Sequence, residues 1–156
     1  MDKQILLGKA IEIATKAHSG QYDKGGKPYI LHPLRLMTQL LFDTELAMIA
    51  VMHDVVEDGD YTLEDLRNEG FSERVLAALA LLTHDSKDDY LKVYIPRIAG
   101  NYDSLRVKRK DLKDNSDITR LKGIRPKDIA RVEKYFIAYT YLGDARKYFQ
   151  SREYPF

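Results

Sequence analysis

Apolar residues recur every three or four positions along most of the chain, while the alternating pattern of a β-strand is scarce. That spacing predicts α-helices, because residues three and four apart lie on one helix face. We expect helices over residues 3–18, 32–42, 44–56, 63–69, 72–82, 86–99, 102–121 and 126–148. The apolar face predicted for the last of these consists of Ile129, Val132, Phe136, Tyr139 and Leu142. The pattern therefore predicts an all-α fold of seven to nine helices.

Local signals place several of the helix ends. Pro33 follows His32 at a predicted helix start, where the missing amide hydrogen of proline costs nothing. Thr62 and Asp65 have the spacing of a capping box, and Ser72 is a predicted N-cap. The segment SGQYDKGGKPYI contains three glycines and a proline and predicts a loop between the first two helices.

Composition narrows the class of protein. The 156 residues suit a single domain, 44% of them are hydrophobic, and 31% are charged. The net charge of +1 provides no overall attraction to nucleic acid or to an anionic membrane. The absence of cysteine excludes disulfides and thiolate metal ligands. The sequence has no apolar run of membrane-spanning length and no signal peptide, so we expect a cytoplasmic protein whose oligomeric state is unknown.

The segment AVMHDVVED, residues 50–58, places ionisable residues inside an apolar helix pattern. His53, Asp54, Glu57 and Asp58 fall within about one and a half helical turns. Burial of several carboxylates without compensation is costly, whereas a divalent cation would use imidazole and carboxylate groups as ligands. The simpler interpretation is a solvated helix end, so the metal hypothesis depends on ligands from other parts of the chain.

Two residues elsewhere are candidates for those ligands. His32 is either a turn residue before proline or a ligand, and Asp111 lies in the charged segment RVKRKDLKDN together with Lys108 and Asn115. We interpret most lysines and arginines of that segment as a solvent-exposed helix face. Nucleic-acid binding by residues 106–113 is a distant alternative, because acidic residues interrupt the run and no aromatic pattern accompanies it.

Taken together, four segments resemble the HD-domain metal-dependent phosphohydrolases. The closest resemblance is to the hydrolase domain of RelA/SpoT-type (p)ppGpp enzymes and to the stand-alone small alarmone hydrolases. The segments are AHSGQYDKGGKPYILHP, AVMHDVVED, GFSERVLAALALLT and VKRKDLKDN. The resemblance implies one HD-type domain over 1–156, a helical bundle around a central metal site, with a motif-bearing core at about 10–120 and a packing helix at about 126–148. Since the sequence ends at residue 156, we expect no synthetase domain to follow.

The resemblance also implies roles for individual residues. The implied metal ligands are His32, His53, Asp54 and Asp111, and the implied metal ion is Mn²⁺. The implied catalytic acids are Glu57 and Asp58, which handle the attacking water and proton transfer. The residues implied to lie near the substrate are Lys24, Lys108 and Asn115. The implied reaction removes the 3′-pyrophosphate of ppGpp or pppGpp as one unit.

One departure leaves the substrate open. Asp23 stands where the alarmone hydrolases usually have arginine, and a carboxylate cannot stack or donate as guanidinium does. An HD phosphohydrolase for a different nucleotide is therefore one alternative, and a nucleotide-sensing domain that does not cleave its ligand is another. The presence of Glu57 argues against the sensing domain, since binding alone does not need it. We interpret His18 as a hydrogen-bonding residue beside the site and His84 as a helix-end residue.

Overall fold

The protein is all-helical over the residues that the computed structural model describes, 1–58 and 60–153, with side chains as far as Ser151. The helices are α1 (Lys3–Ala17), α2 (Leu31–Thr38), α3 (Thr44–Met52), α4 (Val55–Asp58), α5 (Leu63–Asn68), α6 (Glu73–Leu82), α7 (Ile95–Ile98), α8 (Tyr102–Asn115) and α9 (Pro126–Glu153). A π-helical turn, η1 (Tyr90–Tyr94), and a 3₁₀ turn, η2 (Ile118–Arg120), complete them. The described residues contain one isolated β-bridge and no sheet, as the apolar spacing predicts.

Helix α3 is the centre of the hydrophobic core. It packs against α1, α2, α6 and α8, and every residue from Leu46 to Met52 is buried. A helix enclosed on all sides has no polar face, which explains why this segment is almost uniformly apolar in the sequence. Asp43 caps its first turn by accepting a hydrogen bond from the amide of Leu46. This helix ends at the ionisable segment and therefore fixes its depth in the fold.

The predicted helix over 44–56 is interrupted at its ionisable residues. Helix α3 ends at Met52, His53 is its C-cap, and α4 begins at Val55. The His53 imidazole lies 2.8 Å from the carbonyl oxygen of Ala50, to which the His53 amide also donates at 3.5 Å. A side chain that takes a backbone carbonyl weakens the regular hydrogen-bond ladder at this point. His53 and Asp54 thus lie at a junction between two helices.

Other helix ends follow their local signals with a few corrections. The capping box of Thr62 and Asp65 is formed, and Ser72 caps α6. The second helix is shorter than predicted and ends at Thr38. The predicted helix over 86–99 is divided into η1 and α7, since Pro96 supplies no amide hydrogen to the ladder. The predicted helix over 102–121 ends at Asn115, after which Asp117 caps η2.

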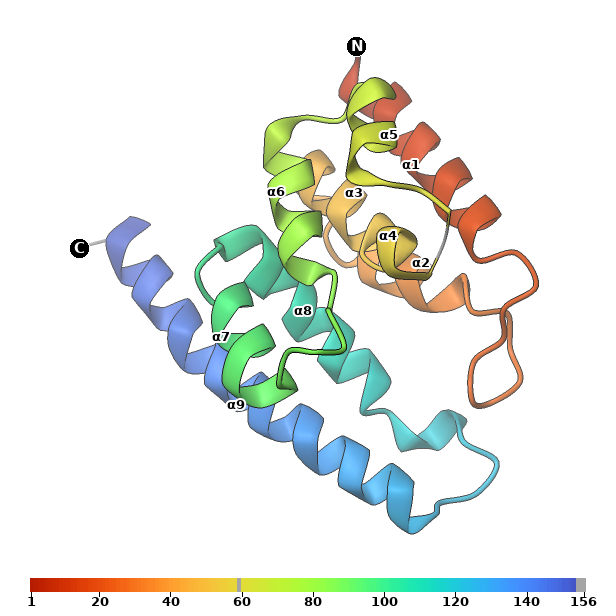
Figure 1. Cartoon of the computed structure of the whole chain (residues 1–156), viewed down its shortest axis with the longest axis vertical. Helices are drawn as coiled ribbons and strands as arrows, with labels where there is room; N and C mark the ends of the chain where they lie inside the picture. The colour runs from red at the N-terminus through yellow and green to blue at the C-terminus, as the bar shows by residue number, and fades with distance from the viewer. Residues whose placement is uncertain (59, 154–156) are drawn as a thin grey trace.

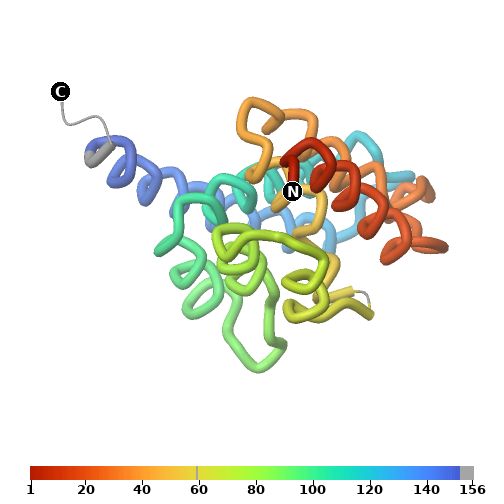
Figure 2. Tube along the Cα trace, turned by 90° about the horizontal axis from the view of Figure 1, so that it is seen from above, coloured from red at the N-terminus to blue at the C-terminus, as the bar shows by residue number. Residues whose placement is uncertain are grey.

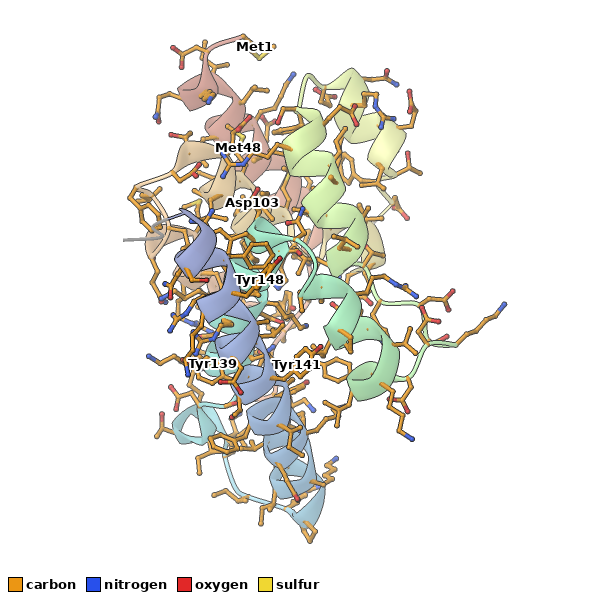
Figure 3. The ribbon with its side chains drawn as sticks, turned by 90° about the vertical axis from the view of Figure 1, so that its left-hand side faces the viewer. Met1, Met48, Asp103, Tyr139, Tyr141 and Tyr148 are labelled. Carbon is orange, nitrogen blue, oxygen red and sulfur yellow. The ribbon has the colours of Figure 1, made fainter. Side chains whose placement is uncertain are left out.

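Helix α9 is longer than predicted and packs along α8 (Figure 1). Figure 2 shows its carboxyl end extending beyond the other helices, and Figure 3 shows Tyr139, Tyr141 and Tyr148 along its length. The predicted buried face is partly wrong. Ala138 and Leu142 are fully buried, but the side chains of Ile129 and Phe136 are 62% and 66% exposed.

The fold brings three separate segments of the chain to one place. Helix α2 contributes His32, the α3–α4 junction contributes His53 and Asp54, and α8 contributes Asp111; α2 and α8 both contact α3. Every helix in the described residues is too short or too polar to span a bilayer.

Candidate metal centre and adjoining cleft

A histidine–carboxylate cluster lies where α2, the α3–α4 junction and α8 meet. His32, His53 and Asp54 each offer one ligand atom, and these atoms lie within 4.8 Å of one another. Asp111 adjoins them, since its Oδ1 atom is 2.8 Å from Nε2 of His32 and 3.3 Å from Nε2 of His53. All four residues predicted as metal ligands are therefore brought together.

The orientation of His53 suits a metal ligand. Its Nδ1 atom donates to the carbonyl oxygen of Ala50 at 2.8 Å, which leaves Nε2 as the atom that faces the cluster. Nε2 is buried and makes no hydrogen bond of good geometry with any described group, although Asp54 lies 3.0 Å away. A backbone carbonyl that fixes the tautomer of an imidazole in this way is a common feature of metal-binding histidines.

His32, the second histidine of the cluster, is held by Asp114 on the side of its ring that faces away from Asp111. Its Nδ1 atom lies 2.6 Å from Oδ2 of Asp114, and Arg35 donates two hydrogen bonds of 2.9 Å to the same carboxylate. Burial would raise the pKa of Asp114, but the hydrogen bonds from His32 and Arg35 outweigh it and hold that pKa well below its usual value. Asp114 therefore stays charged and orients the imidazole of His32.

Asp111 is fixed by neighbours on its own helix. Lys108 donates to its Oδ2 atom at 2.8 Å, and Asn115 donates to its Oδ1 atom at 2.9 Å. Burial opposes the charge on Asp111, but Lys108 and His32 hold its pKa well below the usual value. The positions three before and four after Asp111 lie on the same face of α8, which places both donors beside the carboxylate.

Asp54 is similarly charged and oriented. The phenolic hydroxyl of Tyr29 donates a hydrogen bond to its Oδ2 atom. Burial would raise the pKa of Asp54, but the adjacent His53 lowers it. Conversely, burial would lower the pKa of His53, but Asp54 and Asp111 outweigh this effect and raise it. The two carboxylates therefore favour positive charge at the centre of the cluster.

The donor set fits a divalent transition metal ion. Two imidazoles suit such ions better than Ca²⁺ or Mg²⁺, which prefer oxygen ligands. The Nε2 atom of His53 faces the cluster, and the carboxylates of Asp54 and Asp111 supply negative charge around it. The carboxylate of Asp114 orients His32 from its other side, and together these features suit a bound cation. His18 is outside this group; its Nδ1 atom pairs with Gln21 at 2.9 Å, and its ring packs near Tyr29.

The predicted catalytic acids lie on α4, one turn after the junction. Oε1 of Glu57 accepts a hydrogen bond of 3.1 Å from the backbone amide of His84. Burial, followed by the charges of Asp54 and Asp58, raises the pKa of Glu57. Burial and the charge of Asp54 also raise the pKa of Asp58. A raised carboxyl pKa favours proton transfer near neutral pH.

A cleft of about 300 Å³ opens beside His32. Its lining includes Asn115, three tyrosines and two aspartates, and it carries an excess of positive charge; the cationic members are Lys24, Arg35, Arg120 and Arg131. Burial, followed by the charge of Arg131, lowers the pKa of Lys24. Among the described side chains, Lys24 has no ion-pair partner, so it is available to an anionic ligand. A pocket of this size accepts a small molecule.

The loop over the cleft is shaped by Asp23. Its Oδ1 atom accepts hydrogen bonds of 2.9 Å from the amides of Gly25 and Lys27. Gly25 is required by close approach, because a Cβ atom there would lie 2.3 Å from the carbonyl oxygen of Arg120. Asp23 thus forms the turn that presents Lys24 to the cleft, a role that carboxylates commonly have in loops.

The predicted substrate residues have different positions. Lys24 and Asn115 line the cleft, whereas Lys108 is buried against Asp111, with its ammonium 5.1 Å from the ring centre of Tyr94. The contacts of all three with substrate stay predictions. The contact of Tyr29 with Asp54 and that of Asp114 with His32 are not predicted from the sequence. Asp114 was visible as a carboxylate one turn from Asp111, but its pairing with His32 depends on tertiary structure.

Several curated proteins are similar to part of this chain. A guanosine-3′,5′-bis(diphosphate) 3′-pyrophosphohydrolase of Haemophilus influenzae is 47% identical over 60 residues, which is 36% of this chain and 9% of that protein. The enzyme of the same name from Aquifex aeolicus is 38% identical over 87 residues, 54% of this chain and 12% of that protein. A GTP pyrophosphokinase of Streptomyces coelicolor is 44% identical over 66 residues, 40% of this chain and 8% of that protein. The matches thus span about a tenth of these relatives.

A solved structure supplies the comparison of the fold. It is described as a metazoan ortholog of SpoT that hydrolyzes ppGpp, and it is 23% identical with a TM-score of 0.72, over 90% of this chain and 84% of that one. No family model matches the chain. The expected HD-type all-α fold is confirmed by this structural likeness. From its sequence relatives and its fold, the chain resembles the hydrolase domain of RelA/SpoT-type proteins.

Proposed function

We propose that this protein is a metal-dependent phosphohydrolase of a nucleoside polyphosphate. The substrate that we propose is (p)ppGpp, which water cleaves to GDP or GTP and pyrophosphate. The observation that carries the proposal is the placement of a histidine–carboxylate cluster between the acids of α4 and a cationic cleft. The names of the relatives support the choice of substrate. In this proposal residues 1–156 act as one domain, in the cytoplasm, where guanine nucleotides are made and used.

The metal ion would be held by His32, His53, Asp54 and Asp111. We propose Mn²⁺, as the resemblance implies; the mixed nitrogen and oxygen donor set is compatible with it. When bound, a divalent ion of this class polarises a phosphoryl oxygen and makes a water molecule more acidic. Lys108 and Asp114 hold two of the ligands in place from outside, at 2.8 and 2.6 Å.

Proton transfer would be divided between the two acids of α4. Glu57 has one carboxylate oxygen fixed by the amide of His84, and the other would accept a hydrogen bond from the attacking water. Its raised pKa makes it a suitable proton acceptor. Asp58, whose pKa is also raised, would supply a proton to the leaving oxygen. Neither residue is needed as a metal ligand in this arrangement.

Phosphate binding would use the cations of the cleft. Lys24 lies on the loop, and Arg131 lies on α9, where it is paired with Asp128 at 2.9 Å. Arg35 and Arg120 share the carboxylate of Asp114. Charge-assisted hydrogen bonds to phosphate oxygens are strong, and guanidinium groups make them in pairs. Asn115 would contact the nucleotide from the end of α8.

The test is hydrolysis of ppGpp by the purified protein with Mn²⁺, followed by identification of the products. We expect GDP and pyrophosphate in equal amounts, with turnover lost when the metal is chelated. Glu57→Gln should lower turnover by about 10²- to 10⁴-fold while metal binding is retained. Glu12→Gln, an exposed change on α1, is the matched control and should be fully active. An active Glu57→Gln variant would overturn the assigned role.

A substrate panel distinguishes the remaining alternatives. If ppGpp is not hydrolysed but a different nucleotide is, the protein is an HD phosphohydrolase for that other nucleotide. Asp23 is the residue that motivates this alternative. Saturable nucleotide binding with no product, in protein that holds its metal, would favour a sensing domain. Loss of all nucleotide binding together with absence of bound metal would refute the proposal.

A further inference from the structure

A second cationic groove lies on the opposite side of α8 from the metal cluster. It has a volume of about 390 Å³ and shares no lining residue with the cleft beside His32. It is formed by α8, by α9 and by the segment that joins α2 to α3. Its lining residues are Gln39, Leu40, Phe42, Tyr102, Arg106, Arg109, Lys110, Lys113, Tyr139, Arg146 and Gln150.

The groove concentrates positive charge, most of which has no ion-pair partner among the described side chains. Five of its lining residues are lysine or arginine, and none is acidic. Arg106 is paired with Asp103 at 2.8 Å, but Arg109, Lys110, Lys113 and Arg146 have no ion-pair partner among the side chains that the structure describes. The whole chain has a net charge of only +1, so this excess is local. A concave surface of one charge sign raises the local concentration of the opposite ion.

Three guanidinium groups of the groove have an Nε atom without a hydrogen-bond partner among the described residues. Arg109 lies over the ring of Tyr139 at 4.1 Å, and Arg106 lies over the ring of Tyr102 at 4.2 Å. The Nε atoms of Arg106, Arg109 and Arg146 are buried and have no partner in the described residues. Buried donors normally have acceptors, so these three Nε atoms are uncompensated donors in the wall of the groove. Burial lowers the pKa of Arg109, and the charge of Arg146 adds to this effect while Tyr139 opposes it.

We propose that this groove is a second, non-catalytic site that binds the pyrophosphate group of a nucleoside polyphosphate. Arg109 and Arg146 would hold the phosphates, with Lys110 and Lys113 adding charge at the edge. The side chain of Phe42 lines the same groove and is 75% exposed, so it offers a ring on which a base can stack. The proposal does not depend on hydrolase activity, because it uses none of the residues assigned to the metal cluster or the cleft.

The size of the groove favours a nucleotide over a nucleic acid. A volume of about 390 Å³ is within the range of small-molecule pockets. Nucleic-acid surfaces usually carry their cations along a stripe that follows the phosphate backbone. Here the unpaired cations converge on one concavity between α8 and α9. A compact ligand with several negative charges therefore matches the charge and the shape.

The test is equilibrium titration of the chelator-treated protein with GTP and, separately, with inorganic tripolyphosphate. We expect the double variant Arg109→Gln/Arg146→Gln to weaken GTP binding at this site at least tenfold. Lys24→Gln/Arg131→Gln, which alters the cleft, should leave binding at the groove unchanged. Lys87→Gln/Lys92→Gln removes the same amount of charge from another surface and should also have no effect. Phe42→Ala should weaken GTP binding but not tripolyphosphate binding.

Several results would overturn the proposal. Unchanged GTP binding in folded Arg109→Gln/Arg146→Gln protein would exclude the groove. If that variant does not fold, Lys110→Gln/Lys113→Gln gives the answer, because these side chains lie at the edge and are expected to lower affinity severalfold. Equal affinity for tripolyphosphate and GTP would refute a nucleotide ligand. Tighter binding of single-stranded RNA than of GTP, lost in the same variants, would assign the groove to nucleic acid instead.

Discussion

The Nδ1 atom of His32 lies 2.6 Å from Oδ2 of Asp114, while its other ring nitrogen faces the metal cluster. One carboxylate of α8 thus orients a candidate ligand of α2. Asp114 is itself held by Arg35 through two hydrogen bonds of 2.9 Å. An outer carboxylate of this kind fixes the tautomer of a metal-binding histidine and makes it a better ligand.

This relationship predicts that Asp114→Ala weakens metal binding although Asp114 is no ligand. We expect the affinity for Mn²⁺ to fall by about 10- to 100-fold. Competition with a metal-sensitive dye measures the effect. Asp117→Ala, an exposed aspartate three residues later, is the control and should leave affinity unchanged. Equal affinities in the two variants would show that Asp114 does not orient His32.

A second prediction concerns the loop over the cleft. In Gly25→Ala the new methyl group would meet the backbone oxygen of Arg120 at 2.3 Å, so the loop must move away from η2. We expect weaker substrate binding, seen as a raised KM, because Lys24 moves with the loop. Gly123→Ala is the control, since nothing lies within 4 Å of its new Cβ atom. A normal KM for Gly25→Ala would mean that the loop position does not affect binding.

A third prediction tests which face of α9 is buried. Leu142 is fully buried, so Leu142→Ala should lower the free energy of unfolding by about 2–5 kcal/mol. Phe136 is 66% exposed, and Phe136→Ala should change the free energy of unfolding by no more than about 0.5 kcal/mol. Denaturant unfolding of both variants measures the difference. The face predicted from the sequence spacing contains both residues and would give two similar losses.

A fourth prediction concerns stability in acid. Arg74 donates to Asp103 at 2.9 Å through two nitrogens. Burial opposes charge on Asp103, but its hydrogen bonds with Arg74 and Arg106 hold the pKa below the usual 3.8. A carboxyl group whose pKa is lower in the folded state stabilises the fold at pH values above its pKa in the unfolded chain. This contribution is lost as the pH falls through its pKa in the folded state.

We therefore expect Asp103→Asn to destabilise the protein by about 1 kcal/mol at pH 7. The difference from the wild type should shrink as the pH falls below about 4. Urea unfolding at several pH values measures it, and Asp144→Asn, at an exposed pair with Lys147, is the control. A difference that grows in acid would contradict the assigned sign.

Local signals in the sequence determined most of the helices and the chemistry of the cluster. Apolar spacing placed α1, α6 and α8, and the capping box placed α5, because these features depend only on neighbours in the chain. The ligand types were also recognisable from the resemblance, since residue identity and motif spacing are carried by the sequence itself.

The tertiary structure decided which groups meet. The pairing of His32 with Asp114 joins residues 82 positions apart, and no local pattern encodes it. The break of the helix at His53 and the buried face of α9 likewise depend on what packs against them. Phe136 and Leu142 have similar hydrophobic character, but only Leu142 enters the core. Local propensity sets the elements, whereas burial and pairing are properties of the assembled helices.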